Sequence, residues 1–138
     1  MTTSDIKVLV VDDEPAIRRL LRVGLSTEGY AIREAATARE AVERLAEDLP
    51  DLVILDLGLP DLSGQDLLRK WRAEALNLPI VILSSRTDEA GIVEALETGA
   101  DDYVTKPFGM KELAARLRVA LRHKLQQQGE KPIFQTGE

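Results

Sequence analysis

The chain has 138 residues, which is enough for one domain with a buried core and leaves no room for two. Its formal net charge of −6 argues against nucleic-acid binding through charge, and the absence of cysteine excludes disulfides, thiolate metal sites and cysteine nucleophiles. The first residues lack an export signal and no stretch is long enough to span a bilayer. We therefore expect a soluble, cytoplasmic protein with no membrane partner.

The first half of the chain alternates between two hydrophobic patterns. A nearly continuous aliphatic run at Ile6–Val11 predicts a strand covered on both faces of a parallel sheet. After Pro15 the apolar spacing becomes helical. The inward positions of this helix are predicted to be Ile17, Leu20, Leu21, Gly24 and Leu25. A weaker run from Tyr30 predicts an edge strand, and Thr37 with Glu40 forms a capping box for a second helix.

The second half repeats the alternation. Leu52–Leu55 and Ile80–Leu83 are aliphatic runs and predict two more covered strands, and between them Ser63 predicts the N-cap of a helix that carries Trp71 inward. The following segments are a helix from about residue 88 to 99, an edge strand from about 101, and a last helix from about 110 to 123.

Five strand–helix units in succession predict a doubly wound, five-stranded parallel sheet. The common strand order for such a sheet is 2-1-3-4-5, as in flavodoxin-like folds. Ligands bind beyond the carboxyl ends of the strands, at the point between strands one and three where the order reverses.

Carboxylates collect where two of these strands end. Asp12 and Asp13 follow the first strand, and Asp56 follows the third, its neighbour across the switch point. At about 4 Å two like charges repel by about 1 to 4 kcal/mol, so such a cluster needs a cation. The available ligands are oxygens, which favours a hard ion, Mg²⁺ ahead of Mn²⁺ or Ca²⁺.

The remaining strand ends supply a hydroxyl at Ser84 and a cation at Lys106. A divalent ion and a lysine together neutralise charge that develops on a phosphoryl group, and a carboxylate can hold that group as an acyl phosphate. Each residue also has a structural explanation, since acids favour helix N-termini and serine caps helices. Their convergence at one end of one sheet favours the joint site, with Asp56 as the phosphorylated residue.

Four motifs resemble a bacterial response-regulator receiver domain: "VLVVDDEP", "LVILDLGLPDLSG", "IVILSSR" and "GADDYVTKPF". The resemblance implies that Asp56 accepts the phosphoryl group and that Asp13 binds Mg²⁺ directly. It further implies that Asp12 binds the ion through water and that the carbonyl of Gly58 is another ligand.

The same resemblance implies roles for three more residues. Ser84 is the hydroxyl that the phosphoryl group draws inward, Tyr103 is an aromatic switch, and Lys106 is the cation, followed by a cis peptide at Pro107. The implied phosphoryl donor is a sensor histidine kinase.

"GADDY" and "KPFGMKELAARLRVALR" further resemble the winged-helix (OmpR- and PhoB-like) branch, whose receivers form homodimers through the fourth helix, fifth strand and fifth helix. On that pattern Asp101 meets Arg118 and Asp102 meets Arg116 across a two-fold axis. Glu112 matches a third pair, but the basic partner position is Ile92 here. An ordinary solvated helix face remains the alternative.

"LDLGLPD", "LSSR" and "KPFGMKEL" together resemble most the regulators of Kdp-type potassium uptake (KdpE-like). We expect a receiver domain at residues 1–124. The polar segment 125–138 reads as a linker toward a C-terminal DNA-binding domain that would act in transcription. A receiver that stands alone would have much the same sequence.

Other functions fit less well. A phosphatase with an aspartyl-phosphate intermediate needs an acid two residues after its nucleophile, where this chain has Gly58, so we expect a phosphoryl acceptor and not an enzyme. A flavin or nucleotide site needs a glycine-, serine- or threonine-rich loop where this chain has "DDEP". A histidine phosphocarrier is disfavoured because His123 fits a solvent-facing cation at a helix end.

Overall fold

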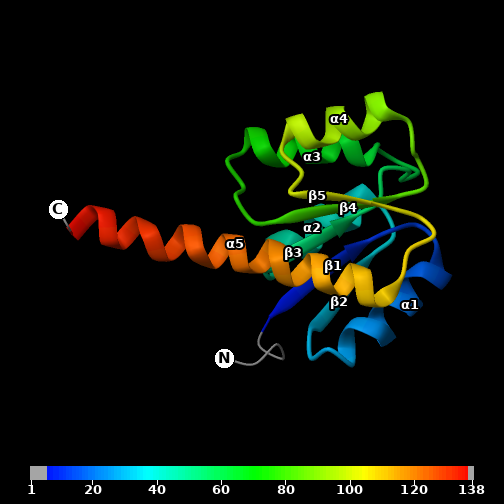
Figure 1. The fold of residues 1–138 in the computed structure, drawn as a ribbon. Helices are drawn as coiled ribbons and strands as arrows, with labels where there is room; N and C mark the ends of the chain where they lie inside the picture. The colour runs from blue at the N-terminus through cyan, green and yellow to red at the C-terminus, as the bar shows by residue number, and fades with distance from the viewer. Residues whose placement is uncertain (1–5, 137–138) are drawn as a thin grey trace.

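In the computed structural model the backbone is described for residues 6–136 and the side chains for residues 6–123. The strands are β1 (Lys7–Val11), β2 (Ala31–Ala35), β3 (Leu52–Leu55), β4 (Ile80–Ser84) and β5 (Asp102–Thr105). The helices are α1 (Pro15–Ser26), α2 (Ala38–Glu47), α3 (Gly64–Ala73), α4 (Glu89–Thr98) and α5 (Met110–Thr136). The strands pair in parallel in the order β2-β1-β3-β4-β5, which confirms the predicted doubly wound sheet (Figure 1).

The sheet divides the apolar residues into two layers. On one face Leu9, Val53 and Ile82 pack with α2, α3 and α4, and on the other face the alternate strand residues pack with α1 and α5. Every residue of β3 and β4 is buried, as expected for strands covered on both sides. This sandwich fixes the strand ends, and hence the residues that follow them, in a rigid frame.

Most predicted inward residues are buried. Trp71 is 1% exposed, and Leu21 and Leu25 of α1 are fully buried. The prediction for Leu20 is wrong, because its side chain is 46% exposed and Leu21 takes the inward position beside it. The 3.6-residue period places Leu20 at the edge of the apolar stripe, where one step in sequence turns the side chain outward.

Helix α2 begins at a well-satisfied N-terminus. The Thr37 hydroxyl accepts a hydrogen bond from the Glu40 N–H (3.0 Å), as the capping box predicts, while the Glu40 carboxylate accepts from the Ala36 N–H. The carboxylate of Asp61, from the loop after β3, accepts the N–H groups of Ala38 and Arg39, both at 2.9 Å. These two bonds lower the pKa of Asp61 and tie the β3–α3 loop to α2.

Arg72, at the C-terminal end of α3, ties three chain segments together from a largely buried position. Its guanidinium donates to the carbonyls of Leu76 (2.6 Å), Leu78 (2.9 Å) and Gly99 (2.8 and 3.0 Å), and it pairs with Asp101 at 3.1 Å. Burial lowers the pKa of Arg72, an effect that Asp101 opposes. The Arg72 guanidinium thus holds together the turn after α3, the segment that leads into β4 and the turn before β5.

Helix α5 is longer than predicted. It continues as helix through Thr136, whereas the sequence predicts its end near His123, and in Figure 1 it extends well beyond the sheet. The predicted linker, 125–138, therefore falls largely within this helix, and residues 137–138 lie outside the described residues. Division of the chain into a domain at 1–124 and a linker stays a prediction, because a continuous helix does not mark where a domain ends. Within residues 6–136, no helix combines the length and apolarity that a bilayer crossing requires.

Candidate functional site

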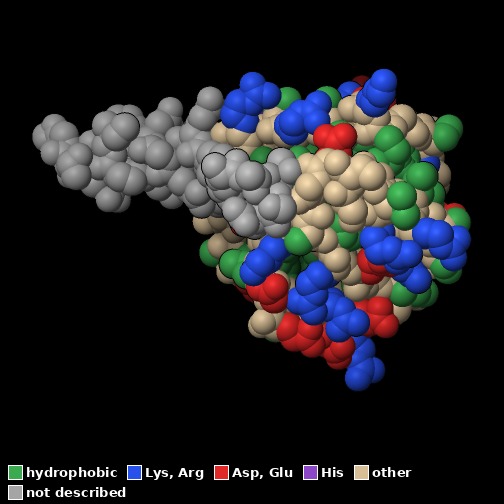
Figure 2. Space-filling model, turned by 90° about the horizontal axis from the view of Figure 1, so that it is seen from below, with side chains coloured by type: hydrophobic (Ala, Val, Ile, Leu, Met, Phe, Trp, Pro, Cys, Tyr) green, Lys and Arg blue, Asp and Glu red, His purple; other side chains and the backbone are tan. Residues whose placement is uncertain are grey.

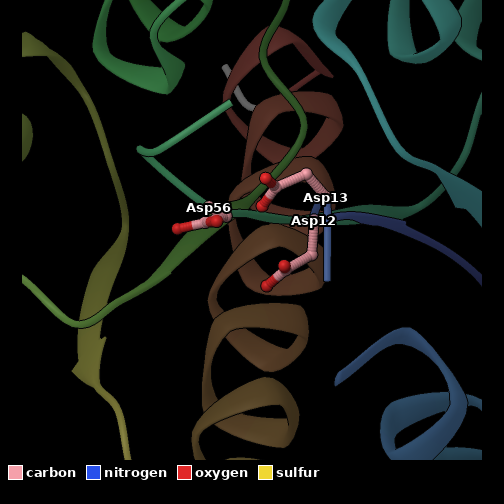
Figure 3. Close-up of side chains that lie close together, drawn as sticks. All are labelled: Asp12, Asp13 and Asp56. Carbon is pink, nitrogen blue, oxygen red and sulfur yellow. The ribbon is translucent and has the colours of Figure 1, made fainter. Parts of the chain in front are cut away.

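Three carboxylates meet beyond the ends of β1 and β3. These strands are paired, with Val11 opposite Leu55, so the residues that follow them come together (Figure 3). Asp12, Asp13 and Asp56 each offer an oxygen, and these oxygens lie within 4.8 Å of one another. Asp12 and Asp56 are buried, while Asp13 is exposed. The predicted acidic cluster is thus present, with one side open to solvent.

The backbone holds two of these carboxylates in place. The Asp12 N–H donates to the carbonyl of Ala35 (3.0 Å) and the Asp56 N–H to that of Val11 (2.9 Å), which extends the sheet by one residue at each strand. Asp56 Oδ1 accepts from the Gly58 N–H at 3.3 Å. Burial, and secondarily the charge of Asp12, raise the pKa of Asp56. The site therefore disfavours its own negative charge unless a cation compensates it.

Lys106 supplies part of that compensation. Its ammonium nitrogen lies 2.9 Å from Asp12 Oδ2, 2.9 Å from Glu14 Oε1 and 3.7 Å from Asp56 Oδ2. Burial lowers the pKa of Lys106, but the neighbouring carboxylates of Asp12 and Glu14 outweigh burial, so the net shift is upward. The lysine is held by its backbone N–H, which donates to the Ser84 carbonyl at 2.8 Å, and is followed by the predicted cis peptide to Pro107.

The two hydroxyl residues that the sequence predicts for the site, Ser84 and Tyr103, lie on the neighbouring strands β4 and β5. Ser84 is buried at the end of β4, and its oxygen accepts from the Arg86 N–H at 3.2 Å. The Tyr103 hydroxyl donates to the Arg86 carbonyl at 2.8 Å. The structure thus places both predicted residues next to one loop, the one between β4 and α4.

The donor set fits a hard divalent cation. Every candidate ligand is an oxygen, and Asp12 Oδ2 is a buried oxygen with no aligned hydrogen bond, even though the Lys106 ammonium is near. A carboxylate oxygen left in this way has a lone pair available for a metal ion. Asp12, Asp13 and Asp56 could therefore hold such an ion, with the exposed side of Asp13 leaving room for water ligands.

Sequence reasoning missed Gly64, the first residue of α3. Its N–H donates to the Leu57 carbonyl at 2.9 Å, and a Cβ at this position would stand 2.2 Å from the Asp56 carbonyl oxygen and 2.7 Å from Leu57 Cα. Both are backbone atoms, so nothing nearby can move aside cheaply. The glycine after the capping Ser63 was the available signal, because a helix start with no side chain permits close approach of another backbone.

Replacing Gly64 by alanine is expected to displace the β3–α3 loop and to lower the free energy of unfolding by about 1 to 3 kcal/mol, as overpacking does. Urea denaturation would measure this loss. Gly109→Ala is the control, because a Cβ there meets no atom within 4 Å and should leave stability nearly unchanged. Equal stability of the Gly64→Ala variant and the native chain would contradict the close approach.

The residues predicted for a dimer interface find partners within the single chain. Arg116 pairs with Asp102 (3.0 Å) and Glu112 (3.2 Å). Arg118 lies 3.3 Å from Glu28, and Asp101 pairs with Arg72 and accepts the Ile80 N–H. The predicted bridges between two chains therefore stay a prediction, one that would require these charges to exchange partners.

A doubly wound sheet with an acidic cluster beyond the ends of β1 and β3 defines the class of fold, and comparison with known proteins gives its family. The chain belongs to the response regulator receiver domain family, whose match covers residues 8–118. It therefore carries the receiver domain of a two-component response regulator, as the sequence motifs indicate.

The relatives include transcriptional regulators. The chain is 51% identical over 133 residues to the transcriptional regulatory protein KdpE of Mycobacterium tuberculosis (strain ATCC 25618 / H37Rv), covering 94% of this chain and 57% of that protein. It is 50% identical over 118 residues to the KDP operon transcriptional regulatory protein KdpE of Escherichia coli (strain K12), covering 83% and 51%. The chain thus spans about half the length of these relatives.

Solved structures agree with the fold. A CheY-like response regulator receiver domain protein from Methanospirillum hungatei JF-1 superposes with a TM-score of 0.84 at 28% identity, covering 88% of this chain and 98% of that chain. The BeF3-activated N-terminal receiver domain of Klebsiella pneumoniae RstA superposes with a TM-score of 0.80 at 34% identity, covering 84% and 98%. The predicted CheY-like architecture is confirmed.

Proposed function

We propose that this chain accepts a phosphoryl group on Asp56 in a Mg²⁺-dependent reaction, with the phosphohistidine of a sensor histidine kinase as donor. One observation carries the proposal: the buried Asp56 carboxylate lies beside two further acids and 3.7 Å from the Lys106 ammonium. Membership of the receiver family supports the same assignment. The group stays on the chain's own side chain, so the chain is an acceptor and not an enzyme that turns over a separate substrate.

The residues divide the work of the transfer. An Asp56 oxygen attacks phosphorus, the bond from phosphorus to the donor nitrogen breaks, and an acyl phosphate forms on Asp56. Asp12, Asp13, Asp56 and the Gly58 carbonyl would hold the Mg²⁺ ion, which when bound neutralises phosphoryl charge.

Two further groups stabilise the transferred phosphoryl group. Lys106 would move its charge from Glu14 toward the new phosphoryl oxygens. The Ser84 hydroxyl would donate to one of them, since it has one proton available and stands at the adjacent strand end. Positioning and charge neutralisation are most of what such a transfer requires.

The test uses a small acyl phosphate with Mg²⁺ and intact-protein mass. A mass gain of one phosphoryl group is expected, and it should disappear when the metal is chelated. Borohydride reduction followed by peptide mapping should place the modification at Asp56, because reduction converts an aspartyl phosphate to homoserine. No mass gain with Mg²⁺, or modification at another residue, would refute the assignment.

The output of this switch is proposed to be transcription. The relatives are named transcriptional regulators, and about half of their length lies outside the match to this chain. A DNA-binding domain in the remaining part would supply the contacts that the net charge of −6 disfavours here. Phosphorylation would shift the receiver toward a homodimer built on α4, β5 and α5.

Arg116→Ala is expected to weaken a dimer induced by a phosphoryl mimic. A two-fold dimer would hold two equivalent Asp102–Arg116 bridges, and partly exposed ion pairs contribute roughly 0 to 1 kcal/mol each, so the dimer dissociation constant should rise by up to about 30-fold. Sedimentation with beryllium trifluoride and Mg²⁺ would measure it. Arg39→Ala, an exposed arginine on α2 that pairs with Glu43, serves as the control. A chain that stays monomeric with the mimic would refute the dimer and leave phosphorylation untouched.

A further inference from the structure

Arg86 connects the site to its surroundings through its backbone. Its N–H donates to the Ser84 hydroxyl oxygen at 3.2 Å, and its carbonyl accepts from the Tyr103 hydroxyl at 2.8 Å. One peptide segment thus contacts the hydroxyl of the site on one side and the aromatic residue of β5 on the other.

The side chain of Arg86 is fixed to the start of α4. Its Nε and Nη2 donate to the two carboxylate oxygens of Asp88, at 2.5 and 3.1 Å. Asp88 is the N-cap of α4 and accepts the Gly91 N–H at 3.0 Å. This fork-shaped pairing gives the guanidinium one orientation relative to the helix. Arg86 is therefore linked through Asp88 to the first turn of α4.

Gly91 explains how Arg86 reaches this position. A glycine inside a helix costs about 1 kcal/mol relative to alanine, so its presence in the first turn of α4 calls for a reason. A Cβ on Gly91 would stand 2.4 Å from Arg86 Nε and 2.7 Å from Cζ. The arginine lies where a side chain at 91 would be. Because those atoms belong to a flexible side chain, an alanine would displace Arg86 without disturbing the fold.

We propose that Arg86 is a positioning residue that transmits the state of the Asp56 site to α4. In this proposal Gly91, which has no side chain, leaves the space beside α4 that the Arg86 guanidinium occupies. The inference rests on the proposed phosphorylation. When Ser84 turns its hydroxyl toward a phosphoryl group, its hydrogen bond with the Arg86 N–H changes geometry. The carbonyl that holds Tyr103 belongs to the same residue, and the side chain carries the displacement to the N-cap of α4.

The experiment measures amide hydrogen exchange in residues 89–92 with and without beryllium trifluoride and Mg²⁺, using the whole chain. In the native chain the mimic is expected to change exchange in this turn. In Arg86→Met that change should be lost while the mimic still binds, as followed by the exchange of the amides of Asp13 and Gly58. A residue that only stabilised α4 would alter the exchange without the mimic and leave the response to it intact.

Arg69→Met is the matched control. Arg69 also reaches α4, through Glu94 at 3.1 Å, and its side chain is 52% exposed, the same as that of Arg86. It makes no described contact with Ser84 or Tyr103. The mimic should therefore change α4 exchange in this variant as it does in the native chain.

Gly91→Ala tests the inference in a second way, because it displaces the Arg86 side chain without replacing it. Alanine favours helix, so a purely local effect would slow exchange in α4 and leave the response to the mimic unchanged. Displacement of Arg86 should instead abolish the response, as in Arg86→Met. A native-like response in either variant, or no response of α4 in a native chain that binds the mimic, would overturn the inference. Failure of the native chain to bind the mimic would instead refute the proposed phosphorylation.

Discussion

Asp56→Asn is expected to abolish phosphoryl uptake and, in the absence of metal, to stabilise the protein. The amide is a far weaker nucleophile than the carboxylate, so no acyl phosphate forms and the mass gain disappears. At the same time the substitution removes one of the buried like charges. Two such charges about 4 Å apart repel by about 1 kcal/mol in water, and the lost attraction to Lys106 at 3.7 Å offsets part of the gain, so stability should rise by at most about 1 kcal/mol. Function and stability thus change in opposite directions.

The stabilisation should depend on pH with a definite sign. Burial and Asp12 raise the pKa of Asp56, so the neutral carboxyl favours the folded state. That contribution is complete below the pKa of the unfolded chain and is lost as pH rises through the raised folded pKa. The advantage of Asp56→Asn should therefore be small in acid, grow as pH rises through the folded pKa, and level off above it.

Thermal unfolding with chelator, repeated across pH, measures the gain in stability and its pH dependence. The same measurement with Mg²⁺ reports how strongly the folded chain binds the ion. Mg²⁺ should raise the melting temperature of the native chain more than that of the variant, because the variant has lost a charged ligand. Asp51→Asn, the same change at the opposite end of β3, should take up phosphoryl groups normally. Uptake by Asp56→Asn, or a variant less stable than the native chain at neutral pH without metal, would contradict the site.

Arg72→Met is expected to destabilise the chain by about 1 to 3 kcal/mol, the range for leaving buried hydrogen-bond acceptors without a donor. Methionine preserves the apolar stem but removes every donor. The carbonyls of Leu76, Leu78 and Gly99 would then lose their shared partner, and Asp101 would lose its cation. Arg72→Lys should rescue little, because an ammonium cannot reach several carbonyls as a planar fork does.

Urea unfolding followed by Trp71 fluorescence measures this effect, since the indole is buried on the same helix. Arg69→Met is the control on α3: its ion pairs are half-exposed, and its loss should cost roughly 0 to 1 kcal/mol. Similar losses in the two variants would mean that the guanidinium of Arg72 contributes no more than a surface charge.

The sequence predicted what local patterns determine. Continuous aliphatic runs located β1, β3 and β4, and parallel pairing then required Asp12 and Asp56 to meet, since each follows a strand. Lys106 was found in the same way, because its strand ends at the same edge of the sheet. Burial on both faces and strand order are thus enough to assemble the central charges of the site.

Other features depend on contacts between distant residues and left weak local signals. Glu14 accepts a hydrogen bond from Lys106, which lies 92 residues further along the chain, and Arg72 donates to the carbonyl of Gly99, 27 residues further along. A glutamate at a helix start, or an arginine in a last helical turn, fits a solvated position equally well. The closeness of Gly64 to the Asp56 carbonyl depends on how the loop folds back, which periodicity does not contain.

The length of α5 means that a small rotation at its start would displace its far end by a large distance. Its 27 residues span about 40 Å at 1.5 Å per residue, and the inward residues Leu113, Leu117 and Leu121 of its first half pack on the sheet. A tilt of about 10° about its start would move its far end by about 7 Å, by the geometry of a helix of that length. A repacking at β5 too slight to alter the sheet would thus become, at Thr136, a displacement larger than a helical turn.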